Sequence, residues 1–314
     1  MSLPSPALTV PTLSDWQLYY AGPALSGVTF GPAPFFWQPK PTGLDLPNIR
    51  NGDSNQPRSR GDYIGLDVDD IRDLTVTFDV GGSNLGGYAS VQAALSALRA
   101  VTNTQGTTEY PLWIKLPNFP LSAMMCRVRK RNFPPDLAYS LGNLAQNCAI
   151  QFHAADPYFY AAPTLDPSVG LPTPGLGFGF NMTFNLNFGG ASGGNTLSVF
   201  NTGDVPCYPL LTITGPCLNP SISNTSMPGN PTLTFDIQLS AGDQLLINTD
   251  FPQSVTYFAD GSNTGSTRMN TLQPGYAWWA LPPGQSIIAF NSQDITAVAG
   301  TLTVDWTSAF SSIV

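Results

Sequence analysis

The residues that could perform chemistry are few and lie far apart in the sequence. His153 is the only histidine, and it lies inside the alternating run CAIQFHA (148–154) without a serine or cysteine pattern of a nucleophile site around it. Catalytic triads and many metal sites depend on a histidine, so this single residue excludes the usual triads and most histidine-dependent metal sites. We interpret His153 as a structural or interfacial residue.

The acidic residues are explained by turns rather than by catalysis. The run LDVDD (66–70) lacks the glycine and the distal glutamate of an EF-hand calcium loop, and a solvated strand end explains it better. Glu109 is the only glutamate, and most aspartates lie in turns such as AGD and ADG, which argues against the paired carboxylates of a glycoside hydrolase. We therefore predict no catalytic residues, no metal site, no cofactor and no enzymatic activity.

The four cysteines do not form a recognisable site. Their spacing matches no zinc motif, and an extended segment between Cys207 and Cys217 would hold their Cα atoms about 30 Å apart, too far for a disulfide. We expect all four to be reduced thiols; they are Cys126, Cys148, Cys207 and Cys217.

An aromatic cluster, YAWWALPPG (276–284), is the sharpest candidate for ligand binding. Exposed Tyr and Trp side chains can stack on sugar rings, but alternate aromatic residues also fill sandwich cores. Neighbours in a strand face opposite sides, so one of Trp278 and Trp279 is expected outside the core, covered by a neighbour or available to a ligand. With Tyr276 they form a candidate ligand or packing surface.

The first half of the chain is predicted to mix strands with one helix. LTVTFDV (74–80) alternates apolar and polar residues, and CAIQFHA is a second strand. The segment 87–101 has apolar residues at helical spacing, with Ser90 as a plausible N-cap. MMCRVRKR (124–131) is a less regular strand, on which three arginines are expected to share one face: Arg127, Arg129 and Arg131.

A polar segment, DLPNIRNGDSNQPRSRGD (45–62), has the composition of a long loop. Loops of this length in a compact domain are usually functional or mobile. Its arginines, Arg50, Arg58 and Arg60, are candidate contacts between subunits, as are Arg127, Arg129 and Arg131.

The second half is predicted to consist of strands and turns. Pro and Gly dominate the segment near 157–178, and after it strands such as 181–188, 232–239 and 301–306 recur every 10–20 residues. This pattern is typical of an antiparallel sandwich. We predict a first domain at 1–160, a linker at 161–178 and a second domain at 179–314.

Charge separates the two halves. Residues 1–160 contain eleven Lys/Arg and twelve Asp/Glu, whereas residues 161–314 contain eight Asp and a single basic residue, Arg268. The chain as a whole has a net charge of −8, and only 10% of its residues are charged. The scarcity of clustered basic residues argues against affinity for nucleic acid. The N-terminus does not resemble a signal peptide, and no apolar run has the length of a membrane span, so we expect synthesis in a cytoplasm without membrane insertion.

The order of motifs in the second half resembles the distal tail proteins of siphophages, especially those that infect actinobacteria. The motifs begin with NTGD (201–204) and the Gly215–Pro216 turn, continue with AGD (241–243) and LPPG (281–284), and end with WTSAF (306–310). In the first half, Arg50, Gly61–Asp62 and Arg72 before LTVTFDV fit the same family, as does FHAADPYFY (152–160). The resemblance covers roughly residues 45–310.

This resemblance implies a fold and an assembly. It implies a mainly β chain with a tail-tube-like β-barrel or sandwich that carries one helix, followed by a galectin-like antiparallel β-sandwich. It also implies a virion structural protein at the distal end of the phage tail, where a homohexameric ring joins the tail tube to the tip hub. DNA would pass through the ring without specific binding. The implied partners are other copies of the chain, the tail tube protein, the tip hub protein and other minor tail proteins.

The same sequence features leave an alternative open. A sandwich with exposed aromatic residues also suits a carbohydrate-binding adhesin or receptor-binding tail protein that contacts a host cell-wall glycan. Fold alone does not separate the two functions. Oligomeric state separates them, because residues 1–160 are expected to form a ring, whereas a monomer or trimer that binds host glycan would favour the adhesin.

Overall fold

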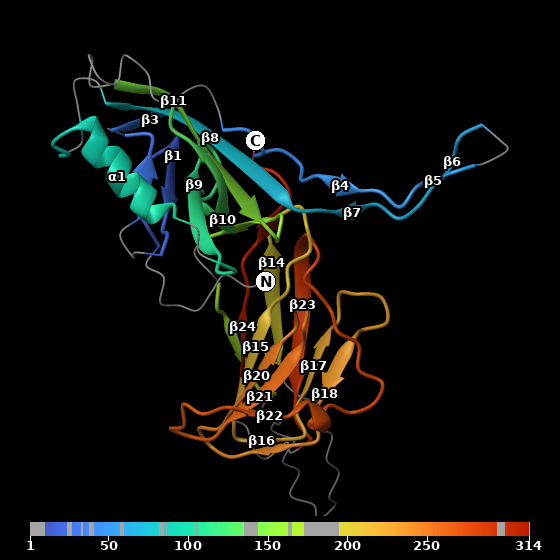
Figure 1. Cartoon of the computed structure of the whole chain (residues 1–314). Helices are drawn as coiled ribbons and strands as arrows, with labels where there is room; N and C mark the ends of the chain where they lie inside the picture. The colour runs from blue at the N-terminus through green and yellow to red at the C-terminus, as the bar shows by residue number, and fades with distance from the viewer. Residues whose placement is uncertain are drawn as a thin grey trace, which may run out of the picture. The chain divides into compact units, whose positions relative to one another are not determined.

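The computed structural model describes residues 10–23, 27–32, 34–37, 41–56, 60–81, 85, 87–103, 106–134, 144–162, 165–172, 195–293 and 299–313. The chain divides into two compact units. The first unit contains residues 3–162 together with 310–314, and the second unit contains residues 163–309. The mainly β class is confirmed, and the described residues include a single α-helix (Figure 1).

The first unit is built on one antiparallel sheet. The end strands β2 and β3 contact each other, so the sheet nearly closes into a barrel, and the short strand β12 (Phe159–Ala161) adds to β10. The sheet order is β2 (Val28–Phe30), β1 (Gln17–Tyr20), β9 (Tyr110–Lys115), β10 (Ser122–Asn132), β11 (Leu144–Ala154), β8 (Arg72–Gly81) and β3 (Phe35–Trp37).

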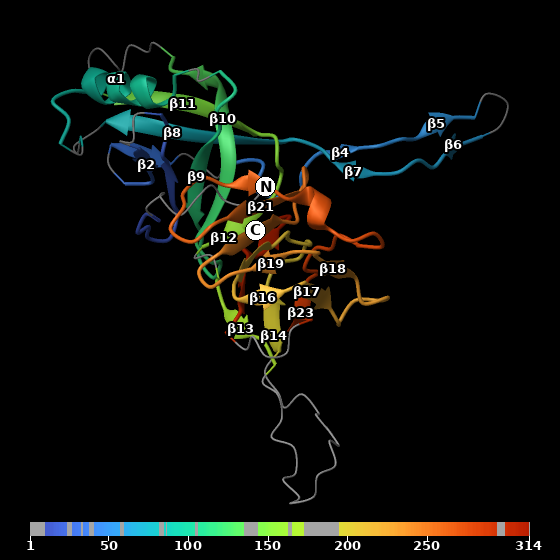
Figure 2. The ribbon, with the colours of Figure 1, turned by 90° about the horizontal axis from the view of Figure 1, so that it is seen from below.

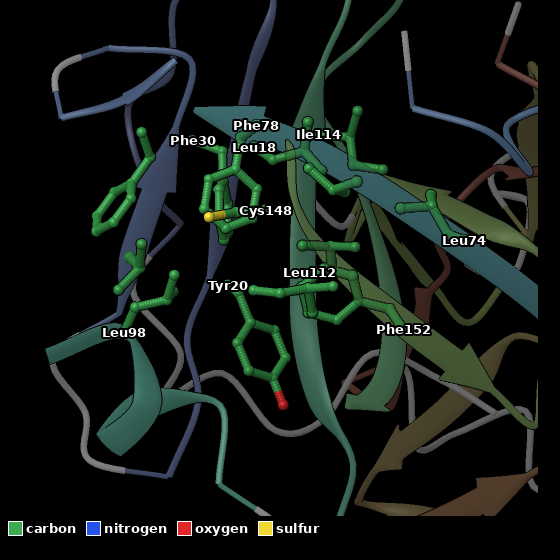
Figure 3. Packing of buried hydrophobic residues seen from close by; sticks show 14 of the residues in the cluster. Leu18, Tyr20, Phe30, Leu74, Phe78, Leu98, Leu112, Ile114, Cys148 and Phe152 are labelled. Carbon is green, nitrogen blue, oxygen red and sulfur yellow. The ribbon is translucent and has the colours of Figure 1, made fainter. Parts of the chain in front are cut away.

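The predicted alternation of LTVTFDV is confirmed in β8. Its apolar side chains, from Leu74 to Val80, are completely buried, whereas the intervening Thr and Asp side chains remain partly exposed. Figure 3 shows Leu74 and Phe78 of β8 in one cluster with Phe152 of β11 and Leu112 of β9. Strands that each bury every second residue therefore share a single core.

The predicted helix is confirmed as α1 (Val91–Val101). The Ser90 hydroxyl accepts a hydrogen bond from the Ala93 N–H at 3.2 Å, as an N-cap residue does. The apolar residues at helical spacing are the buried ones, and Leu98 points into the core cluster (Figure 3). The helix thus covers part of the sheet with the face that its sequence predicted.

In the second unit, the strands of the described residues 165–172, 195–293 and 299–309 pair antiparallel. A six-stranded sheet has the order β13 (Ser168–Gly170), β24 (Thr301–Asp305), β15 (Leu210–Thr214), β20 (Gln244–Asn248), β21 (Ser254–Phe258) and β22 (Ser266–Thr267). A four-stranded sheet has the order β14 (Thr196–Asn201), β23 (Gly284–Asn291), β17 (Ser221–Asn224) and β18 (Thr232–Thr234). Two short elements, β16 (Cys217–Leu218) and β19 (Gln238–Leu239), pair with each other, and η1 (Met269–Thr271) is a single 3-10 turn.

Two details of the second unit differ from the sequence-based expectation. The single strand predicted at 232–239 is divided into β18 and β19, between which Phe235 forms a bridge with Leu272 and the Asp236 N–H donates to the Thr271 carbonyl at 2.7 Å. The segment 161–178, predicted as a linker, contains β13, which pairs with β24. The strand predicted at 181–188 lies outside the described residues, and the galectin-like character of the unit stays a prediction.

The last strand, β25 (Ala309–Phe310), spans the point where the chain leaves the second unit and returns to the first. The sequence analysis did not indicate this return.

Candidate functional site

The most unusual feature of the first unit is a long two-stranded ribbon, here called the arm, which comprises residues 46–71. It is formed by β4 (Ile49–Arg50) with β7 (Val68–Asp69), and farther out by β5 (Ser54–Asn55) with β6 (Asp62–Tyr63). Figures 1 and 2 show the arm extending from the start of β8 away from the sheet. The segment 45–62, predicted to be a loop, thus contains the outgoing strands β4 and β5 and the start of β6.

The arm is bent by an extra residue in its returning strand. Arg50 pairs with Val68 and Ser54 with Tyr63, so three residues on one strand face four on the other, as in a β-bulge. Gly52 and Gly65 meet at this point, and a Cβ atom on Gly65 would lie 2.1 Å from the Gly52 backbone. Only glycine permits this approach of the two strands.

The arm exposes apolar side chains that elsewhere would be buried. Ile64 is 95% exposed and Leu66 80% exposed, and the other exposed apolar residues of the arm are Leu46, Ile49, Tyr63 and Val68. An isolated two-stranded ribbon is at best marginally stable in water, and its two outer edges offer unpaired N–H and C=O groups. Both properties suit a segment that packs on another surface.

The three arginines predicted as contacts in this segment differ in where the structure places them. Arg50 lies in β4 and Arg60 near the tip, and both are exposed. Arg58 lies outside the described residues. The run 66–70 forms the returning strand, where the Tyr158 hydroxyl donates to Asp69 Oδ2 at 2.6 Å and holds the base of the arm.

The arm is anchored by a buried arginine that follows it directly. Arg72 is 1% exposed, and its guanidinium lies 4.6 Å from the centre of the Phe159 ring. Its N–H groups donate to four backbone carbonyls: Pro157 at 2.5 Å, Gly43 at 2.8 Å, Asp45, and Ser311 at 2.5 Å. Burial lowers the pKa of Arg72 to about 10, an effect that nearby Asp45 and Asp69 oppose, so the side chain stays charged at neutral pH.

These contacts join three parts of the first unit at the root of the arm, which we define as residues 43–45 and 72. Gly43 and Asp45 precede the arm and Arg72 ends it, so one guanidinium holds both ends of the ribbon. Ser311 belongs to the end of the chain, more than two hundred residues away in sequence. A buried charge requires such complete pairing, because an unpaired one is very costly.

The arginines of β10 do not share one face, contrary to the sequence-based expectation. Arg127 pairs with His153, whereas Arg131 pairs with the buried Ile150, because a bulge between Val128 and Lys130 shifts the register. Arg131 donates to the carbonyl of Arg99 at 3.0 Å, near the end of α1, where a cation is favourable. Arg129 is exposed within the bulge.

The single histidine has a structural contact. His153 Nδ1 lies 2.8 Å from Asp73 Oδ1, on the face of the sheet opposite the core. On the same face, a recess of about 250 Å³ is lined by Thr75, Lys130, Asn132, Ala149 and Gln151. The recess contains no arrangement of an acid, a base and a nucleophile.

The two tryptophans of the aromatic cluster have different environments. Trp279 is 3% exposed, whereas Trp278 is half-buried and meets the exposed Tyr276 ring edge-on at 6.0 Å. The expectation that one of the two lies outside the core is confirmed, although residues 276–280 are not a strand. Tyr276 and Trp278 form a small aromatic pair in which Tyr276 is exposed and Trp278 is half-buried.

The cysteines are buried and free. Burial raises the pKa of Cys148 and of Cys217 to about 11 and that of Cys207 to about 12, and it also raises the pKa of Cys126. Thiols with raised pKa values are poor nucleophiles at neutral pH. Among the described residues, no group of three or more His, Cys, Asp or Glu side chains could hold a metal ion, and no helix is long and apolar enough to span a membrane.

The motif residues of the second unit serve its turns. Asn201, which is 1% exposed, donates to the carbonyls of Val205 and Leu281 and accepts from the Gly203 N–H at 2.9 Å. A Cβ atom on Gly203 would lie 1.7 Å from the Ala309 carbonyl oxygen, so this position requires glycine. The NTGD turn thereby holds the segment through which the chain leaves the second unit, and the Thr202 N–H donates to Ser308 Oγ at 3.0 Å.

Comparison with known structures identifies a related fold. The SPP1 Dit protein, described as a paradigm of the hub adsorption apparatus in phages that infect Gram-positive bacteria, is 15% identical with a TM-score of 0.61. The match covers 94% of this chain and 98% of that protein. A weaker likeness, at 10% identity and a TM-score of 0.49, is to a chain of the phage P2 baseplate in its activated conformation with Ca, and covers 92% of this chain and 97% of that one.

Comparison of the sequence with protein-family models and with curated proteins gives no match. Over nearly its whole length, this chain has the fold of the SPP1 Dit protein.

Proposed function

We propose that this chain is a structural component of a siphophage tail tip or baseplate, in which six copies form a ring that joins the tail tube to the tip hub. Its contribution is to assembly rather than to catalysis, and DNA passes through the ring without specific binding. The resemblance of its motifs to distal tail proteins supports this proposal, and so does the shared fold with the SPP1 Dit protein.

The arm is the observation that carries the proposal. Its exposed Ile64 and Leu66 side chains need a partner surface, since each would contribute about 1.5–3 kcal/mol if fully buried. The partner is the next copy of this chain in the ring. A contact between the arm of one copy and a different surface of the next is heterologous, and such contacts generate rings when the rotation closes.

The proposal is tested with purified full-length protein by mass photometry and negative-stain electron microscopy. The test variant is Ile64→Ser with Leu66→Ser, and the matched control is Phe251→Ser, which alters an 83% exposed apolar residue of the second unit. We expect rings from the unaltered protein and the control, and folded monomers from the arm variant. Normal rings from the arm variant, or monomers from the unaltered protein at micromolar concentration, would contradict the proposal.

The pair of the exposed Tyr276 and the half-buried Trp278 favours one further candidate, a glycan-binding role of the second unit in tail attachment to the host cell wall. Aromatic rings offer flat apolar faces on which sugar rings can stack. Binding of the Tyr276→Ala, Trp278→Ala variant to purified host cell wall tests this role, because a glycan site would lose its affinity while ring formation stays unchanged. Equal binding by the variant and the unaltered protein would exclude it.

A further inference from the structure

The end of the chain is an integral part of the first unit. Ile313 is 2% exposed and belongs to the core cluster, although residues 163–309 between it and the rest of that core form the second unit. Its N–H donates to the carbonyl of Leu44 at 3.3 Å, and the Phe310 ring packs edge-on against Phe119 at 6.3 Å. We call residues 310–313 the latch.

The latch contacts the root of the arm through Ser311 and Ile313. The Ser311 carbonyl accepts from Arg72 and the Ile313 N–H donates to Leu44, so the latch binds both the segment that enters the arm and the residue that ends it. Without the latch, Arg72 would lose one of its four carbonyl acceptors, and the cavity left by Ile313 would lie beside Leu44. A buried arginine that lacks an acceptor is unstable in its site, so the root would loosen.

The second unit holds the residues just before the latch. The Ala309 carbonyl accepts from the Asp204 N–H at 3.1 Å, and Ser308 accepts from Thr202. The NTGD turn therefore fixes where the chain leaves the second unit. Because the latch follows the second unit in the sequence, it can reach the first unit only after the second unit has been synthesised.

We propose that Arg72 is a positioning residue for the arm, and that the latch, through Arg72 and Leu44, makes arm-dependent assembly conditional on the presence of residues 310–313. This inference rests on the proposed function of the arm. A chain that ends near residue 162 has the barrel, the helix and the arm but an unfixed root. Synthesis of the remaining residues takes on the order of ten seconds, during which incomplete chains are kept from joining a ring. The fragment 1–160, expected from sequence to form the ring by itself, lacks the latch.

The experiment compares the full chain with a variant that ends after Ala309. Hydrogen exchange measures the root directly, and mass photometry measures assembly. We expect at least tenfold faster amide exchange at residues 42–46 and 71–73, at least a tenfold lower ring fraction, and an unchanged unfolding transition of the second unit. An excess of a peptide with the sequence of residues 310–314 should restore both signals. Unchanged exchange and normal rings in the shortened chain would overturn the inference.

A second variant covers the case in which the shortened chain fails to fold. Arg72→Lys keeps the charge, but one ammonium has three donors and cannot reach four carbonyls. We expect the same faster exchange at the root and the same loss of rings; protection and assembly equal to the unaltered protein would overturn the inference. The arm variant Ile64→Ser, Leu66→Ser separates the two proposals. If it forms normal rings, the proposed function of the arm fails, while the exchange data still decide whether the latch fixes the root.

Discussion

The arm and the second unit both expose large apolar side chains, but those of the arm are concentrated in one short segment, whereas those of the second unit are scattered. Six large apolar residues are exposed between Leu46 and Val68 of the arm, and six are exposed among the described residues of the whole second unit. Those of the second unit lie in separate strands and loops; they are Leu165, Phe200, Tyr208, Phe251, Tyr276 and Ile287. Scattered apolar residues are normal on protein surfaces, whereas a contiguous set marks an interaction site.

This difference indicates that the arm, and not the second unit, needs a partner surface to cover its apolar side chains. The NTGD turn of the second unit is held by that unit's own residues, with a paired Asn201 side chain and a closely packed Gly203. The arm has a buried anchor at one end and an exposed ribbon at the other. It is therefore built to present a surface, and the predictions below test this contrast.

The largest expected effect is a loss of stability when Arg72 of the first unit is replaced, compared with Arg268 of the second unit. Arg72→Leu should lower the free energy of unfolding of the first unit by about 3–5 kcal/mol, because four backbone carbonyls lose the buried guanidinium that donates to them. Arg268→Leu is the matched control in the second unit. Arg268 stacks on Tyr257 at 5.5 Å, and its loss should cost about 0.5–1 kcal/mol. Urea unfolding followed for each unit measures both, and equal effects would refute the assigned role of Arg72.

A smaller effect is expected where the second unit uses a carboxylate in a turn. Asp243 accepts backbone hydrogen bonds from Ser240 at 2.8 Å and Asp260 at 3.0 Å, and the bond from Ser240 is the main reason that its pKa is lowered. Asp243→Ala should destabilise the second unit by about 1.5–3 kcal/mol at neutral pH.

The lowered pKa of Asp243 fixes the sign of the pH dependence. The stabilisation is fully present above the pKa of an unfolded aspartate, near 4, and is lost as the pH falls through the lower pKa of the folded state. Thermal unfolding from pH 7 to pH 2 should therefore show the difference between Asp243→Ala and the unaltered protein disappearing in acid. A difference that stays constant with pH would contradict this explanation.

A third prediction uses a carboxylate whose pKa is shifted in the opposite direction. Burial raises the pKa of Asp305 in β24, and the negative charge of Asp166 adds to this effect. A raised pKa means that the ionised form is disfavoured in the folded state, so ionisation costs stability at neutral pH. Asp305→Asn should stabilise the second unit by less than about 1 kcal/mol at pH 7, and the gain should vanish below pH 4. Destabilisation at pH 7 in a denaturant titration would show that Asp305 has a stabilising partner instead.

The smallest expected effect concerns the arm in the dissociated subunit. Ile64→Ser removes a side chain that is 95% exposed, so the free energy of unfolding of the monomer should change by less than about 0.5 kcal/mol. The same substitution should weaken assembly strongly. Calorimetry on dilute, monomeric protein makes this comparison, and a large loss of monomer stability would mean that the arm folds back onto its own subunit.

Periodicity explains what could be predicted from sequence. β8 alternates over ten residues, and α1 has both an apolar stripe and the Ser90 cap, so each produces a clear local signal. The strands of the arm are each two residues long and are interrupted by a bulge at Gly65, so no pattern is long enough to predict a strand by itself. The bulge in β10 likewise moved Arg127 and Arg131 to opposite faces without a signal in the sequence.

Two signals in the sequence could have revealed more of the site. Arg72 lies two residues before Leu74 and therefore on the buried face of β8, which predicts a buried arginine with dedicated partners. Ile64, Leu66 and Val68 alternate with small or acidic residues in a segment with no core of its own. No sequence signal predicts that residues 310–313 pack in the first unit, because this depends on where the chain leaves the second unit.

The central claim is that the arm of one copy binds a different surface of the next copy. A photo-reactive benzophenone amino acid in place of Ile64 tests it most directly, with the same substitution at Phe251 as control. After irradiation of the purified protein, denaturing electrophoresis should show a ladder of covalent oligomers that extends beyond the dimer for position 64 only, with cross-links to residues outside the arm of the neighbouring copy. Absence of cross-links between copies, or a ladder that stops at an arm-to-arm dimer, would contradict the claim.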